Sequence, residues 1–345
     1  MGAGNVARVH ANALSGIPGV EVAAVCDKDE TRAHVLAREL ALEPAFTSVD
    51  AAIASGSFNF AHVLIPPEGH TEVARELARA GIAVFVEKPM GISQADCESL
   101  VREASDRGVR LGVNHNAVFF PAYVKLRRRV KARALGPLQH LAIVLNYPRQ
   151  TLPPLSHWLF ARPQNLVYES AVHPFSQVYD LAGPLRNGHT TVSGRGVGPD
   201  DGFFDTWQVS LVCEDATAQV CVSYAGAYST WQVIAICEDG ILTADLARNR
   251  FTAEKRSRWG RYDEALHVAV AHSAHELMQA VDTLQREVSS ALRRNARRDP
   301  YSTSMKESIA AFHHRPPPNR PDVDGRFATG VVAICDVAAQ AIEGR

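Results

Sequence analysis

The sequence predicts an α/β protein: a doubly wound parallel sheet in the N-terminal half, then an α+β domain with a large, open, mostly antiparallel sheet. Three observations support this fold class. A glycine-rich turn occupies residues 2–7, short apolar runs alternate with helical patterns as far as residue 116, and longer strand-like runs follow Phe120-Pro121. Alternating strands and helices are typical of parallel sheets, whereas successive strands are typical of antiparallel ones.

Size and composition narrow the class of protein. The 345 residues are enough for two cores, and we expect domains over residues 1–117 and 118–345. The formal charge of −1 provides no global field that would attract nucleic acid or an anionic membrane. No apolar run reaches the ~18–20 residues needed to span a bilayer. The six cysteines contain no CxxC pair, as expected for a cytoplasmic protein.

The strands of the N-terminal half are predicted from short, apolar, β-branched runs bounded by turn or charged residues. They are Val20–Cys26, Ala61–Ile65, Ala83–Val86 and Arg110–Val113. Between them, Glu68–Ala80 has apolar residues three and four apart, as on one face of a helix. A second helix is predicted at Ser93–Arg107, because it begins with a capping serine and stops at Gly108.

The C-terminal half has longer strand-like runs. The predicted strands are Leu138–Asn146, Trp207–Cys213, Thr217–Tyr224 and Trp231–Cys237. Asp215-Ala216, between two of these runs, indicates a hairpin. The predicted helices lie between Pro121 and Gly136, from Leu266 to about Leu292, and near Ala328–Ile342.

The glycine-rich turn is a candidate phosphate-binding element. Gly2 allows a tight turn, Gly4 lets the backbone approach a pyrophosphate, and Ala7 is small enough for close packing of helix on sheet. A helix that starts at Asn5 and Val6 would direct its N-terminal N–H groups at the phosphates. The turn therefore predicts a dinucleotide-binding domain of the Rossmann type.

Asp27 supports the same prediction and bears on the choice of cofactor. It lies 23 residues after Gly4, at the end of the next predicted strand, where a carboxylate accepts hydrogen bonds from the adenosine ribose. A carboxylate there would repel a 2′-phosphate, so NAD is favoured over NADP. Lys28 beside it weakens that preference, and NADP remains possible. The structural alternative is that Asp27 only caps the next helix.

One strand of the expected pattern is missing. The fingerprint should follow a strand, yet Met1 stands where that strand would end. A parallel sheet without its central first strand would lose buried apolar side chains, each worth roughly 1.5–3 kcal/mol. We expect either a sequence truncated at its start or another segment that fills the gap, and we favour truncation.

Glu87-Lys88-Pro89 ends the apolar strand at Ala83–Val86. In an open parallel sheet, ligands bind beyond the carboxyl ends of the strands, so Lys88 is expected to face the site. Hydride transfer at a carbinol carbon requires a proton to leave or reach the oxygen. We predict that Lys88 is the base in oxidation and the acid in reduction. The structural alternative is a strand-end lysine whose ammonium group extends into water.

A family resemblance rests on residues that occur in one order along the chain: Gly2-Ala3-Gly4, Asp27, Ile65-Pro66-Pro67, His70, Glu87-Lys88-Pro89, Asn116 and His173. With them the chain resembles the glucose–fructose oxidoreductase/inositol dehydrogenase/MocA family of dehydrogenases, closely over residues 1–185. The resemblance implies hydride transfer between nicotinamide and a secondary alcohol or ketone of a sugar, polyol or nucleotide-linked sugar. It also implies homodimers or homotetramers formed through the outer face of the second domain's sheet.

The resemblance implies roles for individual residues. The implied cofactor contacts are Gly2, Gly4, Asn5, Val6, Asp27, Lys28, Ile65, Pro66, Pro67, His70, Glu87, Lys88 and Asn116. Lys88 is implied near the reacting carbonyl, and Glu169 and His173 match the family's acid-x-x-x-His pair. Their spacing places both on one face of a helix, and a histidine ordinarily titrates near neutrality. His173 could therefore share the proton while Glu169 orients it, or the two could be a helix cap and a surface acid.

The sequence departs from the family at three places. Gln164-Asn165-Leu166 replaces a glycine-rich segment, Ser176 stands where many members have Asp, and Val118 replaces an arginine. These departures bear on substrate contacts, so the substrate and the direction of reaction stay open. Two other functions stay open as well: elimination or glycoside cleavage with retained NAD, and non-catalytic nicotinamide binding. No metal is expected, because no cysteine or second carboxylate completes a ligand set with the histidines near residue 270.

Overall fold

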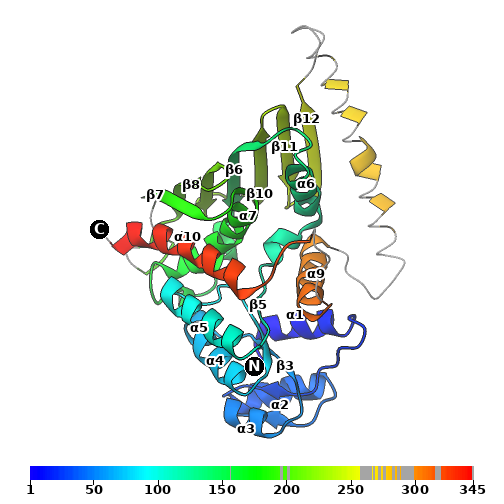
Figure 1. Cartoon of the computed structure of the whole chain (residues 1–345), viewed down its shortest axis with the longest axis vertical. Coiled ribbons are helices and arrows are strands. Elements are labelled where there is room, and N and C mark those ends of the chain that lie inside the picture. Colours follow the sequence, from blue (N-terminus) through cyan, green and yellow to red (C-terminus); the bar gives the residue numbers. More distant parts are fainter. Residues whose placement is uncertain are drawn as a thin grey trace.

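The computed structural model of the chain describes residues 1–155, 157–194, 197–199, 203–256, 299–314 and 320–343, with scattered positions between 266 and 288. A large sheet lies at one end of the molecule, and short strands with their helices lie at the other (Figure 1). Helix α10 (Gly325–Glu343) runs between these two halves and packs against both. The predicted fold class, with one parallel and one mostly antiparallel part, is confirmed.

The N-terminal half alternates strands and helices, as predicted. Its strands are β1 (Val25–Cys26), β2 (Ala45–Phe46), β3 (Phe60–Val63), β4 (Ala83–Val86) and β5 (Leu111–Val113). They form two parallel sheets, ordered β1-β2 and β3-β4-β5. The helices are α1 (Asn5–Leu14), α2 (Glu30–Glu39), α3 (Val49–Ala54), α4 (His70–Arg79) and α5 (Gln94–Asp106).

Strand β4 is buried after its first residue. Val84, Phe85 and Val86 have no exposed surface, which fits a parallel strand covered by helices on both faces. Helix α4 contributes its buried Leu77 and helix α5 its buried Leu100 to the cluster that holds Val84 and Val86, while Phe85 belongs to a different cluster. All residues of this strand are apolar, and the first polar side chains, Glu87 and Lys88, directly follow its last residue.

The predicted strand at Val20–Cys26 is largely wrong. Only Val25 and Cys26 form strand pairs, and they pair with β2, while residues 20–24 have no regular secondary structure. A strand forms where a neighbour satisfies its backbone groups. Among the described residues no strand lies between β1 and β3, so this segment has no such neighbour on one side.

The C-terminal half is built on one seven-stranded sheet with the order β12-β11-β10-β6-β9-β8-β7, in which only β6 and β9 are parallel neighbours. Its strands are β6 (Leu138–Asn146), β7 (Leu185–Ser193), β8 (Thr206–Cys213), β9 (Thr217–Ser223), β10 (Thr230–Cys237), β11 (Gly240–Asp245) and β12 (Arg250–Lys255). The helices are α6 (Pro121–Lys131), α7 (Val172–Ala182), α9 (Pro300–His314) and α10.

One face of the large sheet carries the core of the protein. In β8 the residues alternate strictly between buried and exposed or half-exposed, the pattern of a sheet with one face in the core. The buried side chains of the sheet include Trp207 and Val209 of β8 and Val220 of β9. They form one cluster with Phe175 of α7 and Leu126 of α6. Helices α6 and α7 therefore cover this face, as Figure 1 shows.

Some of the predicted strands and helices agree with the structure, and others were missed. Strands β4 and β6 have the predicted bounds, and the Asp215-Ala216 hairpin between β8 and β9 is confirmed, with Cys213 N–H donating to the Ala216 carbonyl at 3.1 Å. Strands β7, β11 and β12 and helix α9 were not predicted. Most of the helix predicted from Leu266 to about Leu292 lies outside the described residues.

Two predictions from composition can be compared with the described part of the chain. None of its helices combines the length and apolar character of a membrane-spanning segment. All six cysteines are free thiols. The boundary between residues 117 and 118 stays a prediction, because helices α9 and α10 from the end of the chain pack on α1 and α5 of the N-terminal half.

Candidate functional site

The glycine-rich turn crosses between the two parallel sheets. Gly2 has φ +94°, and a Cβ there would lie 2.5 Å from the Leu64 carbonyl oxygen, so only glycine fits. A Cβ on Gly4 would meet nothing within 4 Å. Helix α1 begins directly after Gly4 without a side-chain cap. The turn therefore presents open space in front of a helix N-terminus, as a bound phosphate requires.

Asp27 lies beside the turn, at the end of β1. Its Oδ2 accepts a hydrogen bond from the Ala3 N–H at 2.7 Å, and its Oδ1 accepts one from the Asp29 N–H at 2.9 Å. These backbone bonds orient the carboxylate and leave it lone pairs for ribose hydroxyls. Because Asp29 caps helix α2, Asp27 is not needed as the cap. The open turn and this carboxylate fit the pyrophosphate and the adenosine ribose of an adenine dinucleotide.

The segment after β3 is held by His70. The buried ring of His70 has Nε2 at 2.7 Å from the Ile65 carbonyl oxygen and Nδ1 at 2.7 Å from the Pro89 carbonyl oxygen. Burial lowers the pKa of His70, although both backbone contacts oppose this. The residue thereby ties the Ile65-Pro66-Pro67 segment to the end of β4. Its contact with a cofactor stays a prediction.

Lys88 is the contact between the two halves at the candidate site. Its side chain is 11% exposed, and its Nζ lies 2.9 Å from Glu169 Oε2 and donates a second bond, also of 2.9 Å, to the Glu169 carbonyl oxygen. The Glu169 side chain is 40% exposed. A mostly buried ammonium is thus paired with a carboxylate and a carbonyl, and it does not extend into water as the structural alternative required.

Glu169 and His173 approach Lys88 from an irregular helix start. Glu169 lies in a π-helical segment, Val167–Ala171, and His173 lies in the first turn of α7. The regular helix face that the spacing predicted is therefore interrupted by a π-turn, an insertion often found at functional sites. Both residues still interact with Lys88. The Lys88 ammonium group pairs with the Glu169 carboxylate, and the charge of Lys88 lowers the pKa of His173.

The expectation that His173 titrates near neutrality is wrong. Burial lowers the pKa of His173 well below 6.5, and electrostatic interaction with Lys88 and with His115 lowers it further. Its Nδ1 has no hydrogen-bond partner among the described residues, while its ring packs against Trp231 with centroids 5.8 Å apart. At neutral pH His173 is a neutral imidazole, which can donate or accept a hydrogen bond but does not supply a positive charge.

Glu87 belongs to a buried polar network that the sequence did not predict. Its Oε1 accepts from Asn114 Nδ2 at 2.6 Å and lies 2.8 Å from His10 Nε2. Burial would raise the pKa of Glu87, but the bonds from His10 and Asn114 lower it. The network continues from His10 Nδ1 to His62 Nδ1 at 2.8 Å and from His62 Nε2 to His313 Nε2 at 3.1 Å. One carboxylate oxygen of Glu87 is therefore bound by His10 and Asn114. The other, Oε2, accepts a hydrogen bond from the backbone N–H of Lys88.

The loop after β5 contributes two further buried side chains. Asn116 donates from Nδ2 to Ser304 Oγ of α9 at 3.1 Å, so its amide is used within the protein and its cofactor contact stays a prediction. His115 has no exposed surface, and neither ring nitrogen has a partner among the described residues. Burial lowers the pKa of His115 to about 3.

A group of tyrosines near Glu169 was also missed. Tyr147 and Tyr224 stack with ring centroids 5.6 Å apart, and the Tyr224 hydroxyl bonds Ser170. Burial raises the pKa of Tyr147, and electrostatic interaction with Tyr224 and Glu169 raises it further. Burial together with Glu87 and Glu169 raises the pKa of Tyr301 on α9. Tyrosines from three separate segments thus interact electrostatically with Glu169, a grouping that no local motif indicates.

The remaining site predictions concern exposed or substituted positions. Asn5 and Val6 are exposed at the start of α1, and Lys28 is exposed beside Asp27. Ser176, at the position where Asp was expected, is buried and donates to the His173 carbonyl at 2.6 Å, while Val118 is fully buried. Within the described part of the chain, no group of three His, Cys, Asp or Glu side chains could hold a metal ion.

The fold and the site define a class: an NAD-binding Rossmann domain joined to an α+β domain that brings a carboxylate and a histidine to a strand-end lysine. Residues 1–115 match the family model described as "Oxidoreductase family, NAD-binding Rossmann fold". Over this domain the chain matches the glucose–fructose oxidoreductase/inositol dehydrogenase/MocA family, in agreement with the resemblance of its motifs.

The chain is similar to inositol 2-dehydrogenase of Rhizobium meliloti, with 24% identity over 226 residues, which is 64% of this chain and 66% of that protein. It is similar to UDP-N-acetylglucosamine 3-dehydrogenase of Acidithiobacillus ferrooxidans, with 30% identity over 146 residues, 40% of this chain and 45% of that protein. Each match therefore spans less than two thirds of the relative.

A solved oxidoreductase from Agrobacterium radiobacter, in complex with NAD+, L-tartaric acid and magnesium, has a TM-score of 0.75 to this chain at 15% identity. The match covers 100% of this chain and 95% of that one. At such low identity the likeness shows a shared fold. It extends over both halves of the molecule, including the large sheet beyond residue 115.

Two glycine variants should separate stability from cofactor binding. Gly2→Ala should lower the free energy of unfolding by about 2 kcal/mol, because the methyl group meets the Leu64 carbonyl and φ is positive. Gly4→Ala should leave stability unchanged and weaken NADH binding, because its methyl group enters the open space before α1. Urea unfolding and NADH fluorescence titration measure the two effects. Equal losses of stability, or full NADH affinity in Gly4→Ala, would contradict this geometry.

Stability should fall as the pH is lowered from about 6.5. An unfolded histidine binds a proton near pH 6.5, whereas burial lowers the folded pKa of His115 to about 3. Between these values the unfolded state binds more protons, so acidification favours unfolding, by about 1.4 kcal/mol per pH unit for one such group.

Urea unfolding at pH 7, 6 and 5 measures this slope. His115→Phe should reduce the slope of unfolding free energy against pH by the contribution of about one proton. His34→Gln, at an exposed position on α2, should leave this slope unchanged. An unchanged slope in His115→Phe would show that this histidine is protonated in the folded protein.

Proposed function

We propose that the protein is an NAD-dependent oxidoreductase that transfers a hydride between nicotinamide and a secondary alcohol or ketone of a sugar, polyol or nucleotide-linked sugar. The observation that carries this proposal is the position of Lys88. Its ammonium group lies at the carboxyl end of β4, mostly buried, and is held by Glu169 from the second domain. Ligands of doubly wound sheets bind at this edge.

The similarity to named dehydrogenases supports the reaction class. The relatives include an inositol dehydrogenase and a UDP-N-acetylglucosamine dehydrogenase, whose names refer to ring hydroxyl groups. The tyrosine hydroxyls and Glu169 near Lys88 suit a substrate with several hydroxyls, because a polar substrate needs several hydrogen-bond partners when it leaves water.

The side chains at the site divide the remaining work. NAD, when bound, accepts or donates the hydride. Lys88 exchanges the proton with the substrate oxygen, and Glu169 holds the ammonium group in place. His173, neutral at working pH, bonds the same or a neighbouring hydroxyl instead of changing charge. Asp27 binds the adenosine ribose and favours NAD, since a 2′-phosphate would face its carboxylate.

We propose that the outer face of the large sheet joins copies of the chain into dimers or tetramers. Apolar side chains on this face remain exposed, with Val144 at 39%, Val212 at 49% and Ile241 at 37%. Exposed apolar side chains gathered on one face often mark an interface. Light scattering should give the mass of two or four chains, and Val144→Arg should lower it. The mass of a single chain for the unaltered protein would contradict the proposal.

Lys88→Met should strongly reduce turnover and retain cofactor binding. We expect kcat to fall about 100-fold or more, as for other general acid–base groups, with the NADH dissociation constant little changed. The assay is NAD reduction with a panel of cyclitols, aldoses and UDP-linked hexosamines. Lys131→Met, at an exposed position on α6, is the matched control and should behave as the unaltered protein.

The same assay separates the other functions. Unchanged turnover in Lys88→Met would show that another group moves the proton. Product formation without accumulation of NADH would favour elimination or glycoside cleavage with retained cofactor. NADH binding without product from any panel member would favour a regulatory nicotinamide-binding protein.

A further inference from the structure

Glu87 is a buried carboxylate that the proton exchange at Lys88 leaves unexplained. Its side chain is 13% exposed, yet the Lys88 ammonium group binds Glu169 instead. In the described part of the chain, its one ion-pair partner is His10. His10 Nε2 lies 2.8 Å from Glu87 Oε1, and Asn114 Nδ2 donates to the same oxygen at 2.6 Å. Because a carboxylate oxygen only accepts hydrogen bonds, His10 must carry a proton on Nε2.

The other oxygen of Glu87 binds the backbone of Lys88. Glu87 Oε2 accepts a hydrogen bond from the Lys88 N–H at 3.1 Å, and the Glu87 N–H donates to the Val63 carbonyl of β3 at 2.9 Å. On the far side of Lys88, the Pro89 carbonyl oxygen lies 2.7 Å from His70 Nδ1. The backbone is therefore held on both sides of Lys88, and any change in the Glu87 carboxylate acts directly on the Lys88 main chain.

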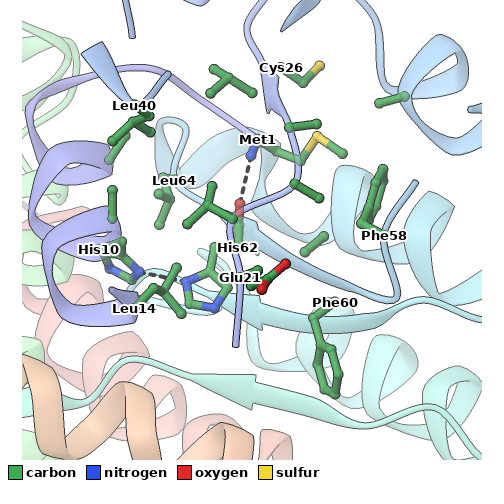
Figure 2. Close-up of a pocket in the computed structure, with 18 of the residues that line it drawn as sticks. Met1, His10, Leu14, Glu21, Cys26, Leu40, Phe58, Phe60, His62 and Leu64 are labelled. Carbon is green, nitrogen blue, oxygen red and sulfur yellow. Dashed lines mark hydrogen bonds between the residues drawn. The ribbon is translucent and has the colours of Figure 1, made fainter. Parts of the chain in front are cut away.

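His10 belongs to the helix that begins at the glycine-rich turn. Helix α1 starts directly after Gly4, and His10 lies on its buried face, 1% exposed. In Figure 2 the His10 ring points from this helix to His62 of β3, and a dashed line marks the contact of 2.8 Å between their Nδ1 atoms. His62 Nε2 in turn lies 3.1 Å from Nε2 of His313 on α9. Both ring nitrogens of His10 are thus engaged, one by Glu87 and one by His62.

The neutral ring of His62 fixes the orientation of His10. Burial lowers the pKa of His62 well below 6.5, and electrostatic interaction with His10 and His313 lowers it further. A neutral imidazole has one N–H and one acceptor nitrogen, so His62 donates to one neighbouring histidine and accepts from the other. The His10 ring therefore cannot turn its Nε2 away from Glu87 without breaking a second buried hydrogen bond, which is costly.

We propose that His10 is a positioning residue for Lys88: its Nε2 keeps Glu87 in the charged form, and this carboxylate holds the Lys88 backbone so that the ammonium group meets the substrate oxygen. This role depends on the proposed function, in which Lys88 exchanges the proton with the substrate. Several titratable groups act electrostatically on Glu87, and among the described residues only the His10 side chain also hydrogen-bonds it. These groups are His10 of α1, Lys88 itself, His70 of α4, His115 after β5 and Tyr301 of α9.

Loss of the His10 bond should make Glu87 easier to protonate. Burial would raise the pKa of Glu87, while the bonds from His10 and Asn114 lower it. Without one of these bonds, the carboxylate should take up a proton at a pH about one to two units higher. A protonated Glu87 has lost its charge, so it accepts the Lys88 N–H less strongly than the carboxylate does.

Two substitutions of His10 separate the roles of its two nitrogens. The amide of His10→Gln takes the place of Nε2 and can bind Glu87, whereas the shorter side chain of His10→Asn takes the place of Nδ1 and can bind only His62. The kcat of His10→Gln should stay within about two-fold of the unaltered protein. In His10→Asn, kcat should fall about ten-fold, and the pH below which kcat declines should rise by about one to two units. The substrate KM and the NADH dissociation constant should stay unchanged in both variants.

Infrared difference spectroscopy of the cofactor-free protein follows Glu87 without turnover. The absorption of a protonated carboxyl group should appear at a higher pH in His10→Asn than in the unaltered protein or in His10→Gln. It should be absent from His10→Asn combined with Glu87→Gln, which identifies the band. If the unaltered protein turns over no member of the panel, the proposed function fails, while this titration still tests whether His10 keeps Glu87 charged.

Asn114→Leu tests the same carboxylate from the end of β5. It removes the second donor to Glu87 Oε1, and Asn114 Oδ1 has no partner among the described residues that would be lost. Glu87 should again take up its proton at a higher pH, which keeps the test open if a His10 variant does not fold. Equal kcat and equal Glu87 titration in His10→Gln and His10→Asn would overturn the proposal. An unchanged Glu87 titration in Asn114→Leu would overturn it as well.

Discussion

The contact between Lys88 and Glu169 is the constraint on which the arrangement of the candidate site depends. A lysine that is 11% exposed needs its charge paired, and the N-terminal half, whose strand β4 is wholly apolar, does not supply the partner. The second domain supplies both a carboxylate and a carbonyl from Glu169. This requirement places the π-helical turn and the start of α7 directly beyond the end of β4, with His173 one turn further on.

The neighbouring groups are consistent with that constraint. Glu87 is held by His10 and Asn114, so its charge is satisfied without Lys88, and the ammonium group is left to face Glu169. The cost is a set of buried neutral histidines, of which His115 is the clearest. Such groups make the fold sensitive to acid, while they keep positive charge at the site concentrated on a single lysine.

Local sequence predicted what depends on local chemistry. The run Ala83–Val86 predicted strand β4 with the correct bounds, and the glycine turn with Asp27 predicted the Rossmann domain. Strand β7 was missed because Asn187-Gly188 signals a turn, although pairing with β8 keeps it extended. The network of His10, His62 and His313 joins residues 52 and 251 positions apart, which no spacing rule connects. The lowered pKa of His173 follows from its burial. The presence of a histidine at this position does not reveal whether its side chain is buried.

The most direct test of the central claim is a double-mutant cycle on kcat with Lys88→Met and Glu169→Gln, using a substrate found in the panel. If Glu169 acts by holding the Lys88 ammonium group, Glu169→Gln alone should slow turnover, and adding it to Lys88→Met should cause no further loss. Two effects that multiply in the double variant would show that the residues act independently. The Lys88–Glu169 contact would then not be the basis of the site.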